Sequence, residues 1–141
     1  MIFWDSSAIV PLLVEEPLSG AATQLARAGE GMLVWWATRV EVLSSIARRE
    51  RERTLEDPEA ARALLADLAK AWAEVVPADE LREQATRLLR VHPLRAADAL
   101  QLAAALTWAG RRPNGHRFAT FDGRLADAAR REGFRLPLPP V

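Results

Sequence analysis

The chain has 141 residues, half of them hydrophobic, which is enough for one domain with a sizeable core. It contains no cysteine, which excludes disulfides, zinc–thiolate sites and cysteine nucleophiles. Its 19 basic and 19 acidic residues cancel, which argues against coating of nucleic acid by overall charge but leaves room for a local basic groove. We expect a single domain over residues 1–141.

Short apolar runs that alternate with longer amphipathic stretches predict an α/β fold with a parallel sheet. Five strands are expected, the last of them at an edge, over residues 2–4, 32–35, 75–76, 117–120 and 134–136. Seven helices are expected over residues 6–14, 18–28, 38–51, 59–72, 79–90, 94–109 and 123–131. The proline-rich end, residues 137–141, is expected to be extended.

Four acidic residues stand where a predicted strand ends or in the first turn of a predicted helix: Asp5, Glu41, Asp98 and Asp122. The carboxyl ends of parallel strands share one edge of the sheet, so we expect these side chains to meet in a crevice there. Gathered carboxylates repel one another unless a cation lies between them, and Mg²⁺ and Mn²⁺ prefer carboxylate oxygens. The pattern therefore predicts an Mg²⁺ or Mn²⁺ site suited to phosphodiester hydrolysis.

Each acid also has an ordinary structural interpretation. Asp5 and Asp122 can cap the helices that follow them, Thr38 and Glu41 match a capping box, and Asp98 complements a helix dipole. However, Ser, Thr and Asn cap helices as well as acids do. Asp5 and Asp122 also follow apolar runs, where an unpaired charge is costly. Together the four residues favour the metal site over four separate caps.

Polar and basic neighbours complete the predicted site. Ser7 lies two positions after Asp5, and Thr120 lies two positions before Asp122. At that distance a hydroxyl can hold the carboxylate in place or can make only a hydrogen bond within the local turn. RNA binding next to an acidic site requires positive charge nearby. Three arginines close in sequence to the acids are the predicted RNA contacts: Arg39, Arg95 and Arg124.

Four segments, residues 2–8, 38–41, 94–103 and 119–125, resemble in order and spacing the PIN-domain ribonucleases, specifically the VapC toxins of type II toxin–antitoxin pairs. The resemblance implies a three-layer α/β/α fold with a parallel five-stranded sheet and about seven helices. It also implies RNA cleavage that depends on Mg²⁺ or Mn²⁺, with Ser7 supporting an acidic cluster of Asp5, Glu41, Asp98 and Asp122. One departure is Gln101, where many relatives carry a histidine.

The resemblance further implies a cognate VapB-like antitoxin, a homodimer, and contact with promoter DNA only through the antitoxin complex. An antitoxin segment would lie in an apolar groove among the first four helices, with predicted groove residues Leu12, Leu13, Val14, Leu43 and Ile46. No signal-peptide pattern or membrane-length apolar run is present, so we expect a cytoplasmic protein without membrane contact.

Other phosphoryl-transfer classes fit less well. A haloacid-dehalogenase-like phosphatase would carry a second aspartate where this chain has Ser7, and a lysine near the crevice, whereas Lys70 lies within a predicted helix. His92 and His116 match no motif for a two-histidine ribonuclease. The remaining alternative is a catalytically silent PIN-like module that binds RNA or protein. Such a module is expected to lose an acid, so the presence of all four favours a hydrolase that leaves 5′-phosphate and 3′-hydroxyl ends.

Overall fold

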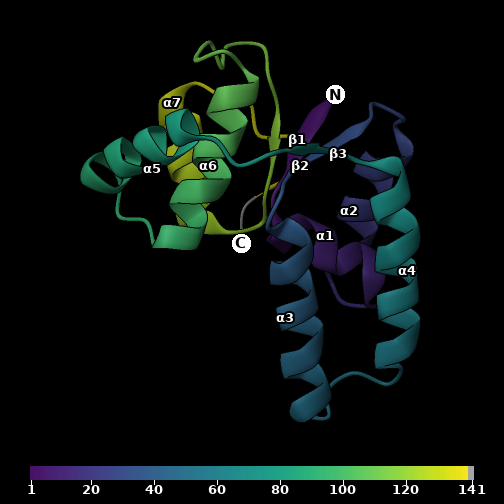
Figure 1. Cartoon of the computed structure of the whole chain (residues 1–141). Coiled ribbons are helices and arrows are strands. Elements are labelled where there is room, and N and C mark those ends of the chain that lie inside the picture. The colour runs from purple at the N-terminus through teal and green to yellow at the C-terminus, as the bar shows by residue number, and fades with distance from the viewer. Residues whose placement is uncertain (140–141) are drawn as a thin grey trace.

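In a computed structural model that describes residues 1–139, a parallel sheet separates two groups of helices (Figure 1). The strands are β1 (Ile2–Trp4), β2 (Met32–Trp35), β3 (Ala73–Val75) and β4 (Phe118–Ala119), in the order β3-β2-β1-β4. Strand β1 lies between two neighbours: β2, the next strand along the chain, pairs with one side of it, and β4 pairs with the other. The strand order therefore reverses at β1, and the crevice for a ligand is expected at its carboxyl end.

The expected fifth strand is wrong for the described residues, which form a four-stranded sheet. Within residues 134–136 only Arg135 pairs, as an isolated bridge to Arg117. Two backbone hydrogen bonds of 2.9 Å flank the bridge, from Phe118 N and from Arg135 N. Pro137 follows at once and has no N–H to donate, so the pairing ends there. Of the predicted extended tail, residues 140–141 lie outside the described part of the chain.

The described residues form seven helices, as predicted. They are α1 (Ser6–Leu13), α2 (Ser19–Arg27), α3 (Thr38–Arg51), α4 (Pro58–Ala71), α5 (Asp79–Val91), α6 (Ala96–Trp108) and α7 (Gly123–Glu132). Helices α1 to α4 cover one face of the sheet, and α5 to α7 cover the other (Figure 1). No helix in residues 1–139 combines the length and the apolarity needed to cross a membrane.

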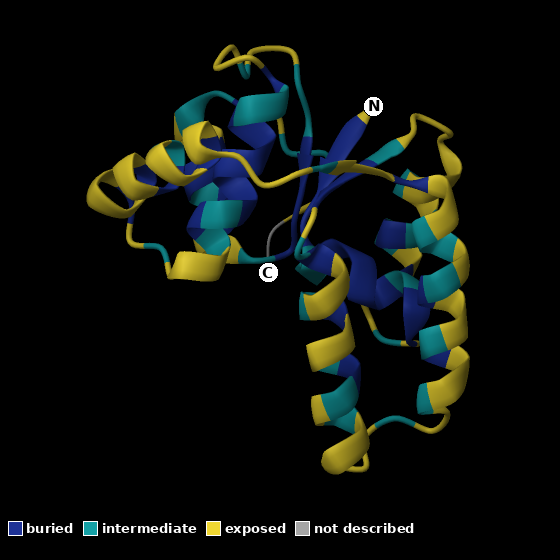
Figure 2. Ribbon diagram, in the orientation of Figure 1, coloured by how far each residue is buried: buried dark blue, intermediate teal, exposed yellow. Residues whose placement is uncertain are grey.

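Alternation along the strands divides the core into two halves. Ile2 and Trp4 point to the α1–α4 face, whereas Phe3 points to the α5–α7 face, because successive strand side chains face opposite ways. Three strands (β1, β2 and β4) and the helices α1 and α6 are largely buried, while the edge strand β3 is mostly exposed and the outer helices expose their far sides (Figure 2).

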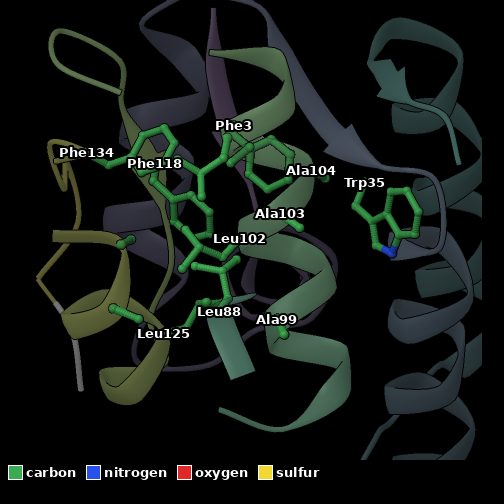
Figure 3. Close-up of a cluster of buried hydrophobic side chains, with 14 of the residues drawn as sticks. Phe3, Trp35, Leu88, Ala99, Leu102, Ala103, Ala104, Phe118, Leu125 and Phe134 are labelled. Atoms are coloured by element: carbon green, nitrogen blue, oxygen red, sulfur yellow. The ribbon is translucent and has the colours of Figure 1, made fainter. Parts of the chain in front are cut away.

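Helix α6 is held firmly against the sheet. Its inward-facing alanines, including Ala99, Ala103 and Ala104, are fully buried and leave room for the aromatic rings of Phe3 and Phe118, whose centroids lie 5.2 Å apart (Figure 3). Small side chains let a helix approach its neighbour closely, so this packing fixes where the first turn of α6 lies. That turn carries Asp98.

Candidate active site

Asp5 directly follows β1 and is buried, with 3% of its surface exposed. Its Oδ1 accepts hydrogen bonds from the Ser7 hydroxyl (2.6 Å) and the Ala8 amide (3.2 Å), and its Oδ2 accepts one from the Thr120 hydroxyl (2.9 Å). The bond from Ala8 caps α1, so the capping interpretation of Asp5 is confirmed. The other two bonds fix the carboxylate between the ends of β1 and β4.

Burial raises the pKa of Asp5 from its ordinary value of 3.8 to about 7. Desolvation of the charged form is the main cause, and the negative charge of Asp122 adds to it. Hydrogen bonds from Ser7 and Thr120 oppose the rise because they stabilise the ionised form. Without a nearby cation, Asp5 is thus a carboxyl that ionises close to neutral pH.

The hydroxyls of Ser7 and Thr120 form a small network around Asp5. Ser7 Oγ accepts from the Phe121 amide (2.9 Å), and Thr120 Oγ1 accepts from the Asp122 amide (3.0 Å). The two hydroxyl oxygens lie 3.2 Å apart, yet when Asp5 is ionised each donates its only proton to the carboxylate. Thr120 was expected either to hold the carboxylate of Asp122 or to make only a local turn bond. The local bond, from the Asp122 amide, is confirmed, and the carboxylate that the hydroxyl holds is that of Asp5.

Asp98 and Asp122 line one hollow of about 570 Å³ together with Arg95, Arg124 and two small neighbours. Oδ1 of Asp122 accepts from the Leu125 amide (2.9 Å) and caps α7, so this interpretation is confirmed as well. Partial burial raises the pKa of Asp98, and the charge of Asp122 raises it further. Positive charge on Arg95 and Arg124 lowers it in part. Two carboxylates and two arginines therefore line the same hollow.

Glu41 lies in the first turn of α3, half-buried. Its Oε2 accepts from Gln101 Nε2 (2.9 Å), and its Oε1 lies 3.5 Å from the Ser6 hydroxyl. Burial raises the pKa of Glu41; Gln101 opposes the rise, and the charge of Asp98 adds to it. The capping box was wrong, because α3 begins without a side-chain cap and the Thr38 hydroxyl accepts from Gln101 (2.9 Å).

The four predicted acids form a row at the carboxyl edge of the sheet. Electrostatic coupling links Asp5 to Asp122, Asp122 to Asp98, and Asp98 to Glu41. Even so, no three acidic or histidine side chains of residues 1–139 are close enough together to hold a metal ion on their own. The row therefore runs from the buried Asp5 to the half-buried acids and forms no closed cage among the described residues.

Comparison with known proteins identifies the fold family. Residues 2–131 match the family model described as PIN domain. The chain is 32% identical over 139 residues to ribonuclease VapC45 of Mycobacterium tuberculosis strain CDC 1551 / Oshkosh, and equally to ribonuclease VapC49 of strain ATCC 25618 / H37Rv. Each match covers 96% of this chain and 94% of the relative. The chain belongs to the VapC family of PIN domains.

Solved structures share the fold of this PIN domain. The crystal structure of Mycobacterium tuberculosis VapC20, described as a sarcin–ricin loop cleaving toxin, has a TM-score of 0.73 at 21% identity and covers 99% of this chain and 100% of that one. A toxin–antitoxin complex from Klebsiella pneumoniae has a TM-score of 0.63 at 16% identity, covering 89% and 91%. FitAcB from Neisseria gonorrhoeae gives the same TM-score and identity, covering 96% of each chain.

The predicted antitoxin groove of this PIN domain needs correction. Leu13, Val14 and Ile46 were expected to line a groove, but all three are buried where α1 to α4 pack together. The apolar hollow on this side, about 180 Å³, is lined instead by residues of β1, β2, α2 and α4, among them Trp4 and Trp72. Of the three predicted RNA contacts, Arg95 and Arg124 line the acidic hollow, and Arg39 does not.

Gln101 is the site residue whose contacts sequence reasoning missed. The signal for it was local: a single amide within the otherwise apolar inward face of α6, from Ala99 to Leu106. A buried polar side chain needs a partner, so such a residue points to a polar contact across the core.

Proposed function

We propose that this VapC-family PIN domain is an endoribonuclease dependent on Mg²⁺ or Mn²⁺, and that it hydrolyses RNA phosphodiester bonds as the toxin of a type II toxin–antitoxin pair. The observation that carries the proposal is the row of four coupled carboxylates at the point where the strand order of a PIN fold reverses. The names of the two curated relatives, both ribonucleases matched over nearly the whole chain, support it.

The donor set fits a hard divalent cation. Three of the four carboxyl groups, Asp5, Glu41 and Asp98, have raised pKa values because of burial and neighbouring negative charge, and a bound cation would relieve both causes. Mg²⁺ commonly uses one or two carboxylates and keeps several waters, which suits a row without a three-acid cage. When bound, Mg²⁺ or Mn²⁺ stabilises charge on a phosphate oxygen and makes a water easier to deprotonate.

Each side chain of the acidic row has a proposed role in metal binding or in the hydrolysis step. Asp5, Asp98 and Asp122 are the proposed metal-holding carboxylates, with the Ser7 and Thr120 hydroxyls keeping Asp5 in place. Glu41 is proposed either as a further ligand or as the group that orients and deprotonates the attacking water, a task that its raised pKa suits. In-line attack at phosphorus then leaves a 5′-phosphate and a 3′-hydroxyl.

Arg95 and Arg124 are proposed to bind the RNA backbone. Both line the hollow that holds Asp98 and Asp122, so they place positive charge where a phosphate must approach two carboxylates. Guanidinium groups bind phosphate oxygens with two hydrogen bonds in one plane, which also orients the phosphate. Arg39, which lies outside the hollow, is proposed only as a more distant contact.

The proposal includes the partners that VapC membership implies. A VapB-like antitoxin is proposed to cover the apolar hollow beside Trp4 and Trp72, and promoter DNA is contacted only through that complex. Three exposed apolar side chains lie on α3 or just before it and are the proposed homodimer contact: Trp36, Val40 and Leu43. The proposed location is the cytoplasm.

The proposal is tested by incubating a mixed cellular RNA pool with the purified protein and with its Asp98→Asn variant, each with Mn²⁺ and with EDTA. Cleavage is expected only from the unmodified protein with metal, and the new ends should carry 5′-phosphate. Ends with 2′,3′-cyclic phosphate would contradict metal-assisted hydrolysis. RNA binding without cleavage by the unmodified protein would favour the silent binding module instead.

A further inference from the structure

Gln101 joins the two helices that carry Glu41 and Asp98. It lies in the second turn of α6 and is 1% exposed. Its Nε2 donates to Glu41 Oε2 and to Thr38 Oγ1, both at 2.9 Å. Within residues 1–139, these are the only side-chain hydrogen bonds between α3 and α6.

The chemistry of Glu41 fixes which way the amide of Gln101 faces. An ionised carboxylate only accepts hydrogen bonds, so the NH₂ group must face it, and the second N–H then meets the Thr38 hydroxyl. The carbonyl oxygen of Gln101 is left buried without a donor among the described residues. An unpaired buried acceptor costs stability, and an apolar residue would avoid that cost. The advantage of an amide over an apolar residue at this position is therefore the pair of hydrogen bonds that its NH₂ group donates.

Little else holds Glu41 in place. Helices α3 and α6 run apart from their first turns (Figure 1), and within residues 1–139 the only other side-chain hydrogen bond to Glu41, from Ser6, is long at 3.5 Å. Glu41 and Asp98 carry like charges and repel each other. Since Glu41 is only half-buried, without Gln101 its flexible side chain can turn away from Asp98 towards solvent.

We propose that Gln101 is a positioning residue that holds the Glu41 carboxylate towards Asp98 across the α3–α6 contact. The role rests on the proposed metal-dependent cleavage, because it matters only if Glu41 acts at the acidic row. Gln101 itself need not touch RNA or metal. Groups that orient metal ligands in this way typically change metal affinity or activity by about 10–100-fold when replaced.

Three variants separate positioning from packing. Gln101→Met keeps length and helix propensity but has no N–H to donate. Gln101→Asn keeps the amide but is one methylene shorter, so it cannot reach Glu41. Thr38→Val is the matched control, because it removes the other partner of Gln101 and leaves the bond to Glu41.

Two measurements decide the proposal. For Mn²⁺ affinity and RNA cleavage, Gln101→Met and Gln101→Asn are expected to lose about 10–100-fold in affinity and in kcat with little change in KM, while Thr38→Val stays near the unmodified protein. Native-like Mn²⁺ affinity and kcat in Gln101→Met would overturn the proposal.

The second measurement is independent of the activity. A double-mutant cycle of Gln101→Met and Glu41→Ala is measured by urea unfolding in EDTA, where a coupling between the two residues is expected. Strictly additive effects would overturn the proposal. If the unmodified protein neither binds Mn²⁺ nor cleaves RNA, the proposed function fails, and this cycle still decides whether Gln101 holds Glu41.

Discussion

The buried carboxyl of Asp5 makes the stability of the metal-free protein depend on pH. Its pKa is about 7 in the folded protein and close to the ordinary 3.8 in the unfolded chain. Between these values Asp5 binds more protons in the folded state than in the unfolded state, so its contribution to stability is greatest below pH 3.8 and is lost as pH rises through about 7. At 1.36 kcal/mol for each pKa unit, the loss is about 4 kcal/mol.

Asp5→Asn removes this dependence because the amide stays neutral at every pH. Urea unfolding in EDTA is measured from pH 4 to 8 for both proteins. Carboxyls that do not interact with Asp5 titrate equally in the two proteins, so the difference between their unfolding free energies reports mainly Asp5, with a smaller contribution from its neighbour Asp122. We expect this difference to move by about 4 kcal/mol in favour of Asp5→Asn as pH rises, a large part of a typical domain stability. A difference that stays constant across the range would refute the reasoning.

Three further predictions follow from the site. Mg²⁺ at 100 times its Kd should stabilise the unmodified protein by about 2.7 kcal/mol but should not stabilise Asp98→Asn. Thermal unfolding with Mg²⁺ and with EDTA measures this, and equal shifts of Tm in the two proteins would contradict the metal site. Arg124→Gln should weaken RNA binding and make the slope of log binding constant against log salt concentration shallower by about 0.7. Arg130→Gln, on the same helix but outside the hollow, should change neither, and an unchanged slope in Arg124→Gln would show that Arg124 does not contact the RNA backbone. His92→Ala breaks a buried 2.7 Å contact to Glu132 and should cost about 1–3 kcal/mol in urea unfolding without changing kcat; a folded variant that no longer cleaves would revive the two-histidine mechanism.

Most of the fold was predictable because its signals are local. Apolar runs marked β1 and β4, and helix starts and ends fell within a few residues of the prediction. The prediction of a fifth strand was wrong because strand formation also depends on pairing partners, which a local sequence pattern does not reveal. Residues 134–136 have strand-like side chains, but only Arg135 finds a partner before Pro137 removes the next backbone donor.

The errors at the site share one cause, which is competition from partners distant in sequence. Thr38 and Glu41 have the spacing of a capping box, yet Gln101, 60 residues beyond Glu41, donates to both side chains. Thr120 is two residues from Asp122, yet its hydroxyl donates to Asp5, 115 residues away. A motif defined by sequence spacing considers only partners that are near in sequence. A buried donor bonds to the acceptor that the packed core places closest, which can be far away in sequence.

Helix capping and metal binding are not exclusive roles for the acids of this site. Asp5 and Asp122 both cap a helix through Oδ1, so Oδ2 of each takes no part in the cap, and Oδ2 of Asp5 accepts from Thr120. A cap therefore fixes the direction of a carboxylate at the strand end without using up its second oxygen. The property that sets these acids apart from ordinary caps is their environment. Asp57 also caps a helix, but it is exposed, whereas Asp5 is buried beside another carboxylate. Burial beside another carboxylate, and not position at a helix start, is therefore the feature that identifies the site.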